Sequence, residues 1–591
     1  MIRGTIHFQR LKSEENIMRF RAALLVSSLL FIGLPVTVKT QVTVSSHQKI
    51  SETQGNLGCV LGDVDLFGQS MASLPDLDGD GVRDLAVGSQ RDDDGGQDRG
   101  AVYILFMNSD GSVKSHAKIS STEGGGPMLS DDDEFGTSVA WLGDFGSGAP
   151  TSHAMAVGAD LDGSEHHGSV YLLFLDSSGT NPGTVVSYHK IDDTEPDLMG
   201  AFNFEERFGN SLAYLGDLGP GADTPRALAV GAIGDNDGAG VFRGAVWLLF
   251  LDSDGSVYSH LEISATDLPL ADDDRLGTGL SCLGDLDGSG SSVCALASGA
   301  AGDDSGGERR GAVWILFLNN DGTLGSSQKV SDVDGDFGGV LDDYDAFGSS
   351  VASLGDWNGD SVPDLAVGAP SGDDAPSSDN PGSVWILYLT QSGTVLRARE
   401  ISSTAGCFMS QLDDDDRFGN ALCTPGDLDG NGVLDLAIGA IFDDDGCDLS
   451  NLDRGAVYVV FLDACPPASW SNYGTGHPGT NGIPKLTIDA DPVLGSTITL
   501  LADNSLGALT TGVLFIGLSD ACLPLKDGKL LVNPLVIFIV PVPPAGLALP
   551  GSIPCNTGLC GISLFLQLLE VDPGASRGIS FTPGLEMILG S

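Results

Sequence analysis

Short apolar runs alternate with polar, glycine-rich turns along most of the chain. In the first repeat of this pattern the apolar or β-rich runs lie at residues 70–74, 85–88, 101–107 and 113–119. The turn Asn-Ser-Asp-Gly at 108–111 is typical of a β-hairpin and joins the last two runs. Four antiparallel strands in one repeat predict the blade of a β-propeller.

The same pattern occurs six times. Each copy has a Phe-Gly or Leu-Gly step, an acidic loop, an Asp-Leu-Ala-Val-Gly-Ala-like run and an Arg-Gly-Ala-Val-like run. The steps lie 68 to 73 residues apart, at Phe67, Phe135, Phe208, Leu276, Phe347 and Phe418. A β unit repeated at this period predicts an all-β fold with a six-bladed propeller over residues 41–464. Seven blades are the less favoured alternative.

The ends of the repeat array predict how the ring closes. Five copies contain the complete final hairpin, but the sixth copy runs from its third strand into Cys465-Pro466-Pro467. Ahead of the first copy, residues 46–51 (Ser-His-Gln-Lys-Ile-Ser) match residues 115–120 (Ser-His-Ala-Lys-Ile-Ser). We therefore expect the strand at 46–51 to complete the sixth blade and to remove the open sheet edges.

The two ends of the chain have a different character. Within residues 1–40, two arginines precede the uncharged run 22–34, which is too short to span a bilayer and predicts a signal peptide, with Met18 as an alternative start. A retained anchor is the other interpretation. Residues 465–484 are predicted to be a linker or an irregular start, and residues 485–591 a small C-terminal β-sandwich. Prolines in its uncharged stretch favour buried strands over a membrane-spanning helix.

The amino-acid composition limits the classes of partner and the cellular location that the chain can have. The 81 acidic residues outnumber the 28 basic ones and give a net charge of −53, which excludes nucleic acid as a partner because phosphate binding needs positive charge. Ten cysteines fit disulfides in a secreted, extracellular or cell-surface protein. They lack the closely spaced Cys/His pairs of a zinc site.

The acidic loop of the first repeat has the spacing of a calcium loop. Residues 76–84 place carboxylates at positions 1, 3, 5 and 9, and a main-chain carbonyl at position 7 adds another oxygen. Calcium prefers six to eight oxygen ligands in a flexible geometry. The predicted ligands in this loop are Asp76, Asp78, Asp80, Val82 and Asp84.

Two further repeats carry the same loop. In the fifth repeat the candidates are Asp356, Asn358, Asp360, Val362 and Asp364. In the sixth they are Asp427, Asp429, Asn431, Val433 and Asp435. Asp, Asn and Gly also form good turns, but turn formation alone does not require acids at these spacings. We therefore predict calcium as the cofactor of three loops.

The remaining loops are weaker candidates. The fourth repeat keeps Asp285, Asp287 and Ser289 but has Val293 at position 9. The second and third repeats keep only their first acid and are two residues longer, so we expect them to have lost the metal. Acidic runs also precede the Phe-Gly steps, and we predict solvated loops there, with a second layer of cations as the alternative. These runs lie at 131–134, 272–274 and 413–416.

The Phe-Gly step, the Asp-x-Asp-x-Asp-x-x-x-Asp loop and the Gly-Ala strand together resemble FG-GAP repeats, known from the propeller of integrin α-subunits. The resemblance covers residues 41–464. It implies a β-propeller with calcium in these loops and a role in extracellular adhesion or ligand binding, with a protein or a polysaccharide as partner. Integrin propellers have seven blades and this chain has six repeats, so integrin ligand specificity is not carried over.

No catalytic motif stands out. FG-GAP propellers also occur attached to hydrolase domains, but no segment here supplies a separate His/Asp cluster, a Gly-x-Ser-x-Gly elbow or a P-loop. The group Glu165-His166-His167 is more simply explained as an exposed turn. We expect a secreted calcium-binding module rather than an enzyme. The alternatives are an extracellular hydrolase or lyase acting on polysaccharide at the propeller channel, and a passive cell-surface structural protein.

Overall fold

The computed structural model divides the chain into two compact units, one ending at Cys465 and the other beginning at Pro466. The described residues are 41–591 except 146–152, 164, 177–180, 200, 217, 219–225, 237–240, 289–293, 373–380, 409, 411 and 445–452. The predicted signal peptide at 1–40 therefore lies outside the described residues. Among the residues that are described, no helix has the length and apolar character needed to cross a membrane.

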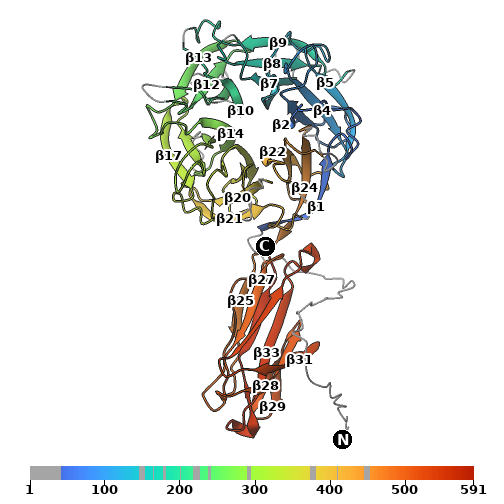
Figure 1. The fold of residues 1–591 in the computed structure, drawn as a ribbon, viewed down its shortest axis with the longest axis vertical. Coiled ribbons are helices and arrows are strands. Elements are labelled where there is room, and N and C mark those ends of the chain that lie inside the picture. The colour runs from blue at the N-terminus through green and yellow to red at the C-terminus, as the bar shows by residue number, and fades with distance from the viewer. Residues whose placement is uncertain are drawn as a thin grey trace. The chain divides into compact units, whose positions relative to one another are not determined.

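Six four-stranded antiparallel sheets form the first unit. Figure 1 shows that they are arranged in a ring. Blade one contains β2 (Phe67–Ser73), β3 (Leu85–Ser89), β4 (Ala101–Met107) and β5 (Val113–Ile119). Blade two contains β6 (Ser138–Asp144), β7 (His153–Ala159), β8 (Ser169–Leu175) and β9 (Val185–Ile191). Blade three contains β10 (Phe208–Gly216), β11 (Arg226–Ala232), β12 (Ala245–Leu251) and β13 (Val257–Ile263).

The remaining blades follow the same order. Blade four contains β14 (Leu276–Gly284), β15 (Cys294–Ala300), β16 (Ala312–Leu318) and β17 (Leu324–Ser331). Blade five contains β18 (Ser350–Gly355), β19 (Asp364–Ala369), β20 (Ser383–Leu389) and β21 (Val395–Ile401). Blade six contains β22 (Phe418–Gly426), β23 (Asp435–Ala440), β24 (Ala456–Cys465) and β1 (Gln41–Ile50).

The ring closes through the N-terminal strand. Strand β1 runs antiparallel to β24, with His47 opposite Val460 and Ile50 opposite Val457, and so becomes the fourth strand of the blade that the sequence leaves incomplete. The first strands of the blades contact one another in the order β2, β6, β10, β14, β18, β22 and back to β2. The all-β propeller therefore has six blades.

The Phe-Gly steps connect neighbouring blades through close packing and hydrogen bonds. Phe135 is fully buried, and Gly136 adopts φ +100°, a conformation that glycine tolerates best. The Ser70 hydroxyl of blade one donates to the carbonyl of Gly136 at 2.8 Å. A side chain on Gly88 would lie 2.0 Å from that carbonyl, which explains the glycine in the second strand of the repeat. The same hydroxyl-to-glycine bond joins Ser138 to Gly209, Ser211 to Gly277 and Ser350 to Gly419.

The second unit is also all β. Its largest sheet contains β25 (Ser469–Tyr473), β35 (Gly584–Ile588), β33 (Ser563–Val571), β28 (Thr510–Gly517) and β31 (Val536–Val542), with β34 (Ile579–Phe581) beside β33. A smaller sheet contains β26 (Leu486–Ile488), β27 (Thr497–Ala502) and β32 (Leu547–Ser552). Strands β29 (Asp520–Leu525) and β30 (Gly528–Val532) form a hairpin.

Two expectations for this unit need correction. The stretch 465–484 is not a free linker, because Ser469–Tyr473 pairs with β35 and His477 pairs with Phe581. The Gly- and Pro-rich composition of the stretch does not predict these pairings, because the partner residues are about a hundred positions away in the chain. The uncharged strand β31 is not buried either: Ile537 and Ile539 are 55% and 66% exposed at the edge of the sheet.

Candidate metal centre

The candidate calcium loops connect the first and second strands of blades one, five and six. Residues 76–84 lie between β2 and β3, residues 356–364 between β18 and β19, and residues 427–435 between β22 and β23. Because the blades are equivalent, these connections lie at the same face of the ring. The ninth position of each loop is at or beside the first residue of the second strand.

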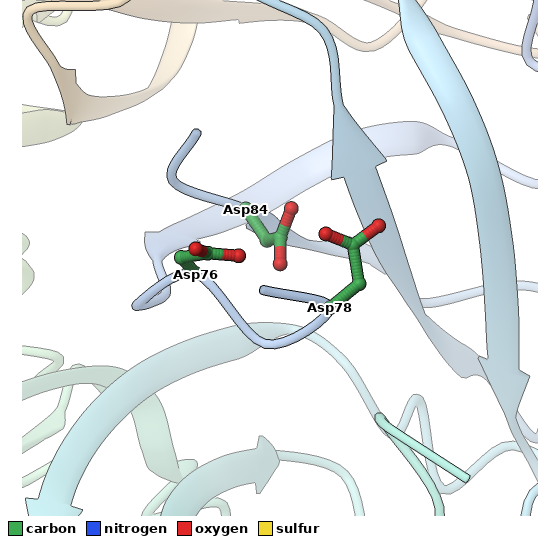
Figure 2. A group of neighbouring side chains, drawn as sticks. All are labelled: Asp76, Asp78 and Asp84. Atoms are coloured by element: carbon green, nitrogen blue, oxygen red, sulfur yellow. The ribbon is translucent and has the colours of Figure 1, made fainter. Parts of the chain in front are cut away.

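In blade one the acids converge. Asp76, Asp78 and Asp84 each offer a carboxylate oxygen, and these three oxygens lie within 4.8 Å of one another (Figure 2). The first acid also shapes the loop: the N–H groups of Gly79 and Asp80 donate to Asp76 Oδ1 at 2.6 and 3.0 Å. The loop is thus folded around its first carboxylate, with the third- and ninth-position carboxylates turned toward it.

The ninth acid holds the loop to the blade. Asp84 is buried, and its two oxygens accept the N–H groups of Leu77 and Met107 at 2.8 and 3.1 Å. The same two bonds recur in blade five, where Asp364 accepts from Trp357 and Leu389, and in blade six, where Asp435 accepts from Leu428 and Leu462. One carboxylate therefore joins the second residue of the loop to the end of the third strand.

Burial disfavours the charge on these ninth acids. Desolvation raises the pKa of Asp84 and of Asp435 from 3.8 to about 6, and the pKa of Asp364 to about 7, against the opposing effect of the two N–H donors. The neighbouring loop carboxylates raise the pKa further. A cation placed among these oxygens would reverse both effects, because an opposite charge favours the ionised form.

In blade five the loop contains a buried oxygen without a partner. Asp356 accepts the N–H groups of Asp360 and Ser361 at 2.9 and 2.8 Å, as Asp76 does in blade one. Asn358, at position 3, is 6% exposed, and among the described residues its Oδ1 accepts no hydrogen bond. A buried polar oxygen normally has a partner. Calcium coordinated by Asn358 Oδ1 would supply one, so this loop fits the ion.

Blade six repeats the cluster of blade one. Asp427, Asp429 and Asp435 bring three carboxylate oxygens within 4.8 Å of one another. Asn431, at position 5, accepts the N–H of Val433 at 2.7 Å through Oδ1 and donates through Nδ2 to the carbonyl of Leu462 at 2.8 Å. Asn431 therefore joins the loop to the third strand. Its side chain is a neutral amide, whereas the same loop position holds a carboxylate in blades one and five.

The valines at position 7 take part through their main chain only. The side chains of Val82, Val362 and Val433 pack against the apolar cores of the blades. Their N–H groups each donate to the side chain at position 5. The proposed ligand at this position is the carbonyl oxygen, and the side chain, buried in Val362 and partly buried in Val82 and Val433, anchors the residue that carries it.

The fourth blade lacks the ninth acid. Gly284 pairs with Ala295 in the register that pairs Gly355 with Asp364 and Gly426 with Asp435, so the apolar Ala295 takes the place of the carboxylate. Counting along the sequence instead places Val293 there, because the loop is two residues longer. Asp285 and Asp287 are described, but they form no three-acid group within the described part of the chain. Ser289 lies outside the described residues.

The acidic runs before the Phe-Gly steps are only partly solvated. In each run the acid two residues before the step is buried, and it accepts the N–H three residues earlier: Asp133 from Ser130, Asp274 from Ala271 and Asp416 from Asp413. Asp131 and Asp272 face arginines, Arg99 at 2.8 Å and Arg243 at 2.9 Å. The predicted solvated loops are thus seen for the outer acids Asp131 and Asp272, which are more than half exposed, whereas the buried acid of each run folds the turn that leads into the blade.

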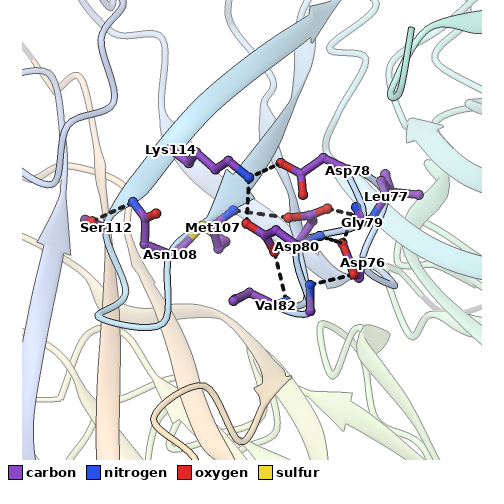
Figure 3. A network of polar contacts seen from close by, with 12 residues as sticks. Asp76, Leu77, Asp78, Gly79, Asp80, Val82, Met107, Asn108, Ser112 and Lys114 are labelled. Carbon is purple, nitrogen blue, oxygen red and sulfur yellow. Dashed lines mark hydrogen bonds and ion pairs between the residues drawn. The ribbon is translucent and has the colours of Figure 1, made fainter. Parts of the chain in front are cut away.

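Lys114 is the residue that sequence analysis missed. From β5 its ammonium lies 2.7 Å from Asp78 Oδ2 and 2.6 Å from Asp80 Oδ2, as Figure 3 shows. It thus supplies positive charge at two of the proposed calcium ligands. The equivalent residue of blade five is Leu396, since both follow the first paired residue of their strands at the same bulge. In the sequence, the only indication of this contact was a lysine on the exposed side of the predicted fourth strand.

Replacing Lys114 by methionine is expected to tighten calcium binding in blade one about three- to tenfold, because the ion no longer competes with an ammonium group. The measurement is calorimetry in a background in which Asp356→Asn and Asp427→Asn weaken the other two loops. The reciprocal change Leu396→Lys, made with Asp76→Asn and Asp427→Asn, is expected to weaken the blade-five site. Unchanged affinity in both variants would show that Lys114 does not compete.

Calcium-free protein is expected to lose stability as the pH rises from 5 to 8. The ninth acids bind protons more tightly in the folded chain than in the unfolded one, so their stabilisation is complete below about pH 4 and is lost as pH passes through about 6 to 7. The expected loss is about 1 to 3 kcal/mol per loop. Melting curves in chelator and in calcium test this, and equal pH slopes in both would contradict it.

The comparisons with known proteins agree with this geometry. The family model of the FG-GAP repeat matches residues 67–105 and 347–387, which contain the loops of blades one and five. Phosphatidylinositol-glycan-specific phospholipase D of Rattus norvegicus is 33% identical over 182 residues, which are 30% of this chain and 18% of that protein. Integrin alpha-5 of Xenopus laevis is 36% identical over 121 residues, or 20% of this chain and 10% of the integrin.

Other integrin α-subunits show the same level of similarity. Integrin alpha-M of Mus musculus is 33% identical over 94 residues, which are 16% of this chain and 8% of the integrin. The chain therefore carries FG-GAP repeats and is similar to integrin α-subunits, while it spans less than a fifth of the length of each of these relatives.

Proposed function

We propose that this chain is an extracellular, calcium-binding β-propeller that serves as an adhesion or ligand-binding module. The observation that carries the proposal is the ninth acid of three loops, buried and held by the same two N–H donors in blades one, five and six. In blades one and six this carboxylate lies within 4.8 Å of carboxylate oxygens at loop positions 1 and 3. Calcium would neutralise the clustered charge and fix the connection between the first two strands.

Two features support an extracellular location. Cys407, Cys465, Cys555 and Cys560 are disulfide-bonded, which is typical of proteins from oxidising compartments. Extracellular modules commonly bind calcium with dissociation constants of about 0.1 to 1 mM, and such sites fill only where calcium is abundant. The similarity to integrin α-subunits supports a binding role, with an extracellular protein or polysaccharide as partner.

The first test is calorimetric titration of the full chain with calcium, after treatment with chelator. We expect about three sites, with one site lost in each of Asp84→Asn, Asp364→Asn and Asp435→Asn. The matched control is Asp285→Asn in blade four, which should leave the stoichiometry unchanged. Absence of calcium binding would overturn the metal part of the proposal.

The binding role is tested separately. The immobilised chain is exposed to arrays of matrix proteins and polysaccharides in calcium, and the retained ligand is then assayed again in chelator. Specific retention that falls in chelator supports a calcium-dependent binding module. Cleavage of an arrayed polysaccharide in place of retention would favour the enzymatic alternative.

A further inference from the structure

We propose that Cys282 and Cys294 form a disulfide that closes the neck of the blade-four loop. The two residues lie on the neighbouring strands β14 and β15, at the points where the chain leaves the sheet and returns to it. Their sulfur atoms are 3.3 Å apart, and both side chains are partly exposed. The two thiols are thus already placed side by side and are reachable from solvent.

The pairing follows from the blade, since the same two positions interact elsewhere in the ring. The first position lies near the end of the first strand, ahead of the loop. The second position lies two residues before the residue of the second strand that pairs with the first position. In blade one these positions hold Ser73 and Arg83, joined by a hydrogen bond of 3.1 Å from Nε to Oγ. In blade two they hold Trp141 and His153, whose rings are 5.6 Å apart. Cysteines at these positions therefore face each other.

Blade four has a physical need for such a link. In blades one, five and six the ninth carboxylate ties the loop to the third strand, whereas blade four has Ala295 at that place. Its loop is also two residues longer than the loop of blade one. A disulfide across the neck would close this loop covalently and restrict the unfolded chain. It would thus replace the lost carboxylate with a bond that needs no metal.

The chemistry is ordinary thiol–disulfide exchange. A hydrogen bond from Cys294 lowers the pKa of the Cys282 thiol, which favours the thiolate as the attacking group. The thiolate attacks one sulfur of a low-molecular-weight disulfide, such as oxidised glutathione, and releases one thiol. Cys294 then attacks the sulfur of Cys282 and releases the second thiol. Two protein thiols are oxidised and one external disulfide is reduced, and the two protons pass to the released thiolates.

The experiment is peptide mapping of the full chain after incubation with oxidised glutathione. Free thiols are blocked with N-ethylmaleimide, the protein is digested without reductant, and linked peptides are identified by mass spectrometry. We expect one linked pair that contains Cys282 and Cys294, absent from Cys282→Ser and unchanged in the control Cys522→Ser. Blocking of both thiols by N-ethylmaleimide in the oxidised protein would overturn the proposal.

Melting curves give a second readout that does not depend on digestion. The oxidised wild-type chain is expected to melt about 3 to 6 °C above the oxidised Cys282→Ser/Cys294→Ser double variant. The difference should disappear when both proteins are compared in reductant, which cancels the contribution of the other disulfides. A difference that persists in reductant would assign it to packing of the serines and would contradict a stabilising bond.

Discussion

Saturating calcium is expected to stabilise the folded propeller by about 8 kcal/mol. A ligand present at about a hundred times its dissociation constant stabilises the folded state by about 2.7 kcal/mol per site, and three equivalent loops are proposed to bind. The gain is large because the calcium-free loops hold buried carboxylates such as Asp84 and Asp364 beside other acids. In the unfolded chain these acids are solvated and far apart, so calcium favours the folded state.

The measurement is denaturant unfolding of the full chain in calcium, in magnesium and in chelator. Magnesium is the matched control, since it demands a tighter octahedral geometry and retains its waters, and it should stabilise far less than calcium. The two units of the chain can unfold separately, so the transition of the propeller is followed by its buried tryptophans, such as Trp247 and Trp314. Identical unfolding curves in calcium and in chelator would show that the acidic loops are turns that do not bind calcium.

The substitution Asp364→Ala is expected to destabilise the calcium-free propeller by about 3 to 5 kcal/mol. It leaves the buried N–H groups of Trp357 and Leu389 without an acceptor, and an unsatisfied buried donor costs about 1 to 3 kcal/mol. The loss arises without any metal, because the carboxylate joins the loop to the third strand of the blade. In calcium the total loss should increase further, since one binding site is also removed.

Two variants separate these contributions. Asp364→Asn keeps one acceptor oxygen and is expected to cost about half as much in chelator. Asp360→Ala removes a half-buried acid whose Oδ1 accepts the N–H of Val362 at 3.0 Å, and it should cost clearly less than Asp364→Ala because Asp364 is fully buried and accepts two N–H groups. Equal destabilisation by Asp364→Ala and Asp360→Ala in urea unfolding would contradict the structural role of the ninth acid.

The sequence predicted the all-β propeller because each blade repeats a local signal. The Phe-Gly step, the acidic loop and the apolar runs recur in order, so a single repeat suffices to place the strands of the other five. The match between 46–51 and 115–120 indicated which strand could fill the sixth blade, where β1 now lies beside β24. These features depend on periodicity and composition, which a sequence displays directly.

Features that depend on distant partners could not be predicted in this way. Ser469–Tyr473 lies in a Gly- and Pro-rich stretch, and it forms a strand by pairing with β35, which is about a hundred residues away in the chain. Lys114 on β5 contacts Asp78 in the loop between β2 and β3, and the two residues are 36 positions apart in the chain. Ala295 replaces the ninth acid because the blade-four loop is longer, and only strand register reveals that shift. Counting along the loop had pointed to Val293.

The position of β1 has a consequence for synthesis. The Ser45 hydroxyl donates to the carbonyl of Phe461, a contact between residues 416 positions apart. A ribosome therefore releases the first strand long before its partner β24 exists, and the nascent chain must carry two open β edges until nearly the whole ring has been made. Such edges recruit other strands, and long-range closure is slow. The acidic character of the chain, with its net charge of −53, keeps half-made rings apart during that interval.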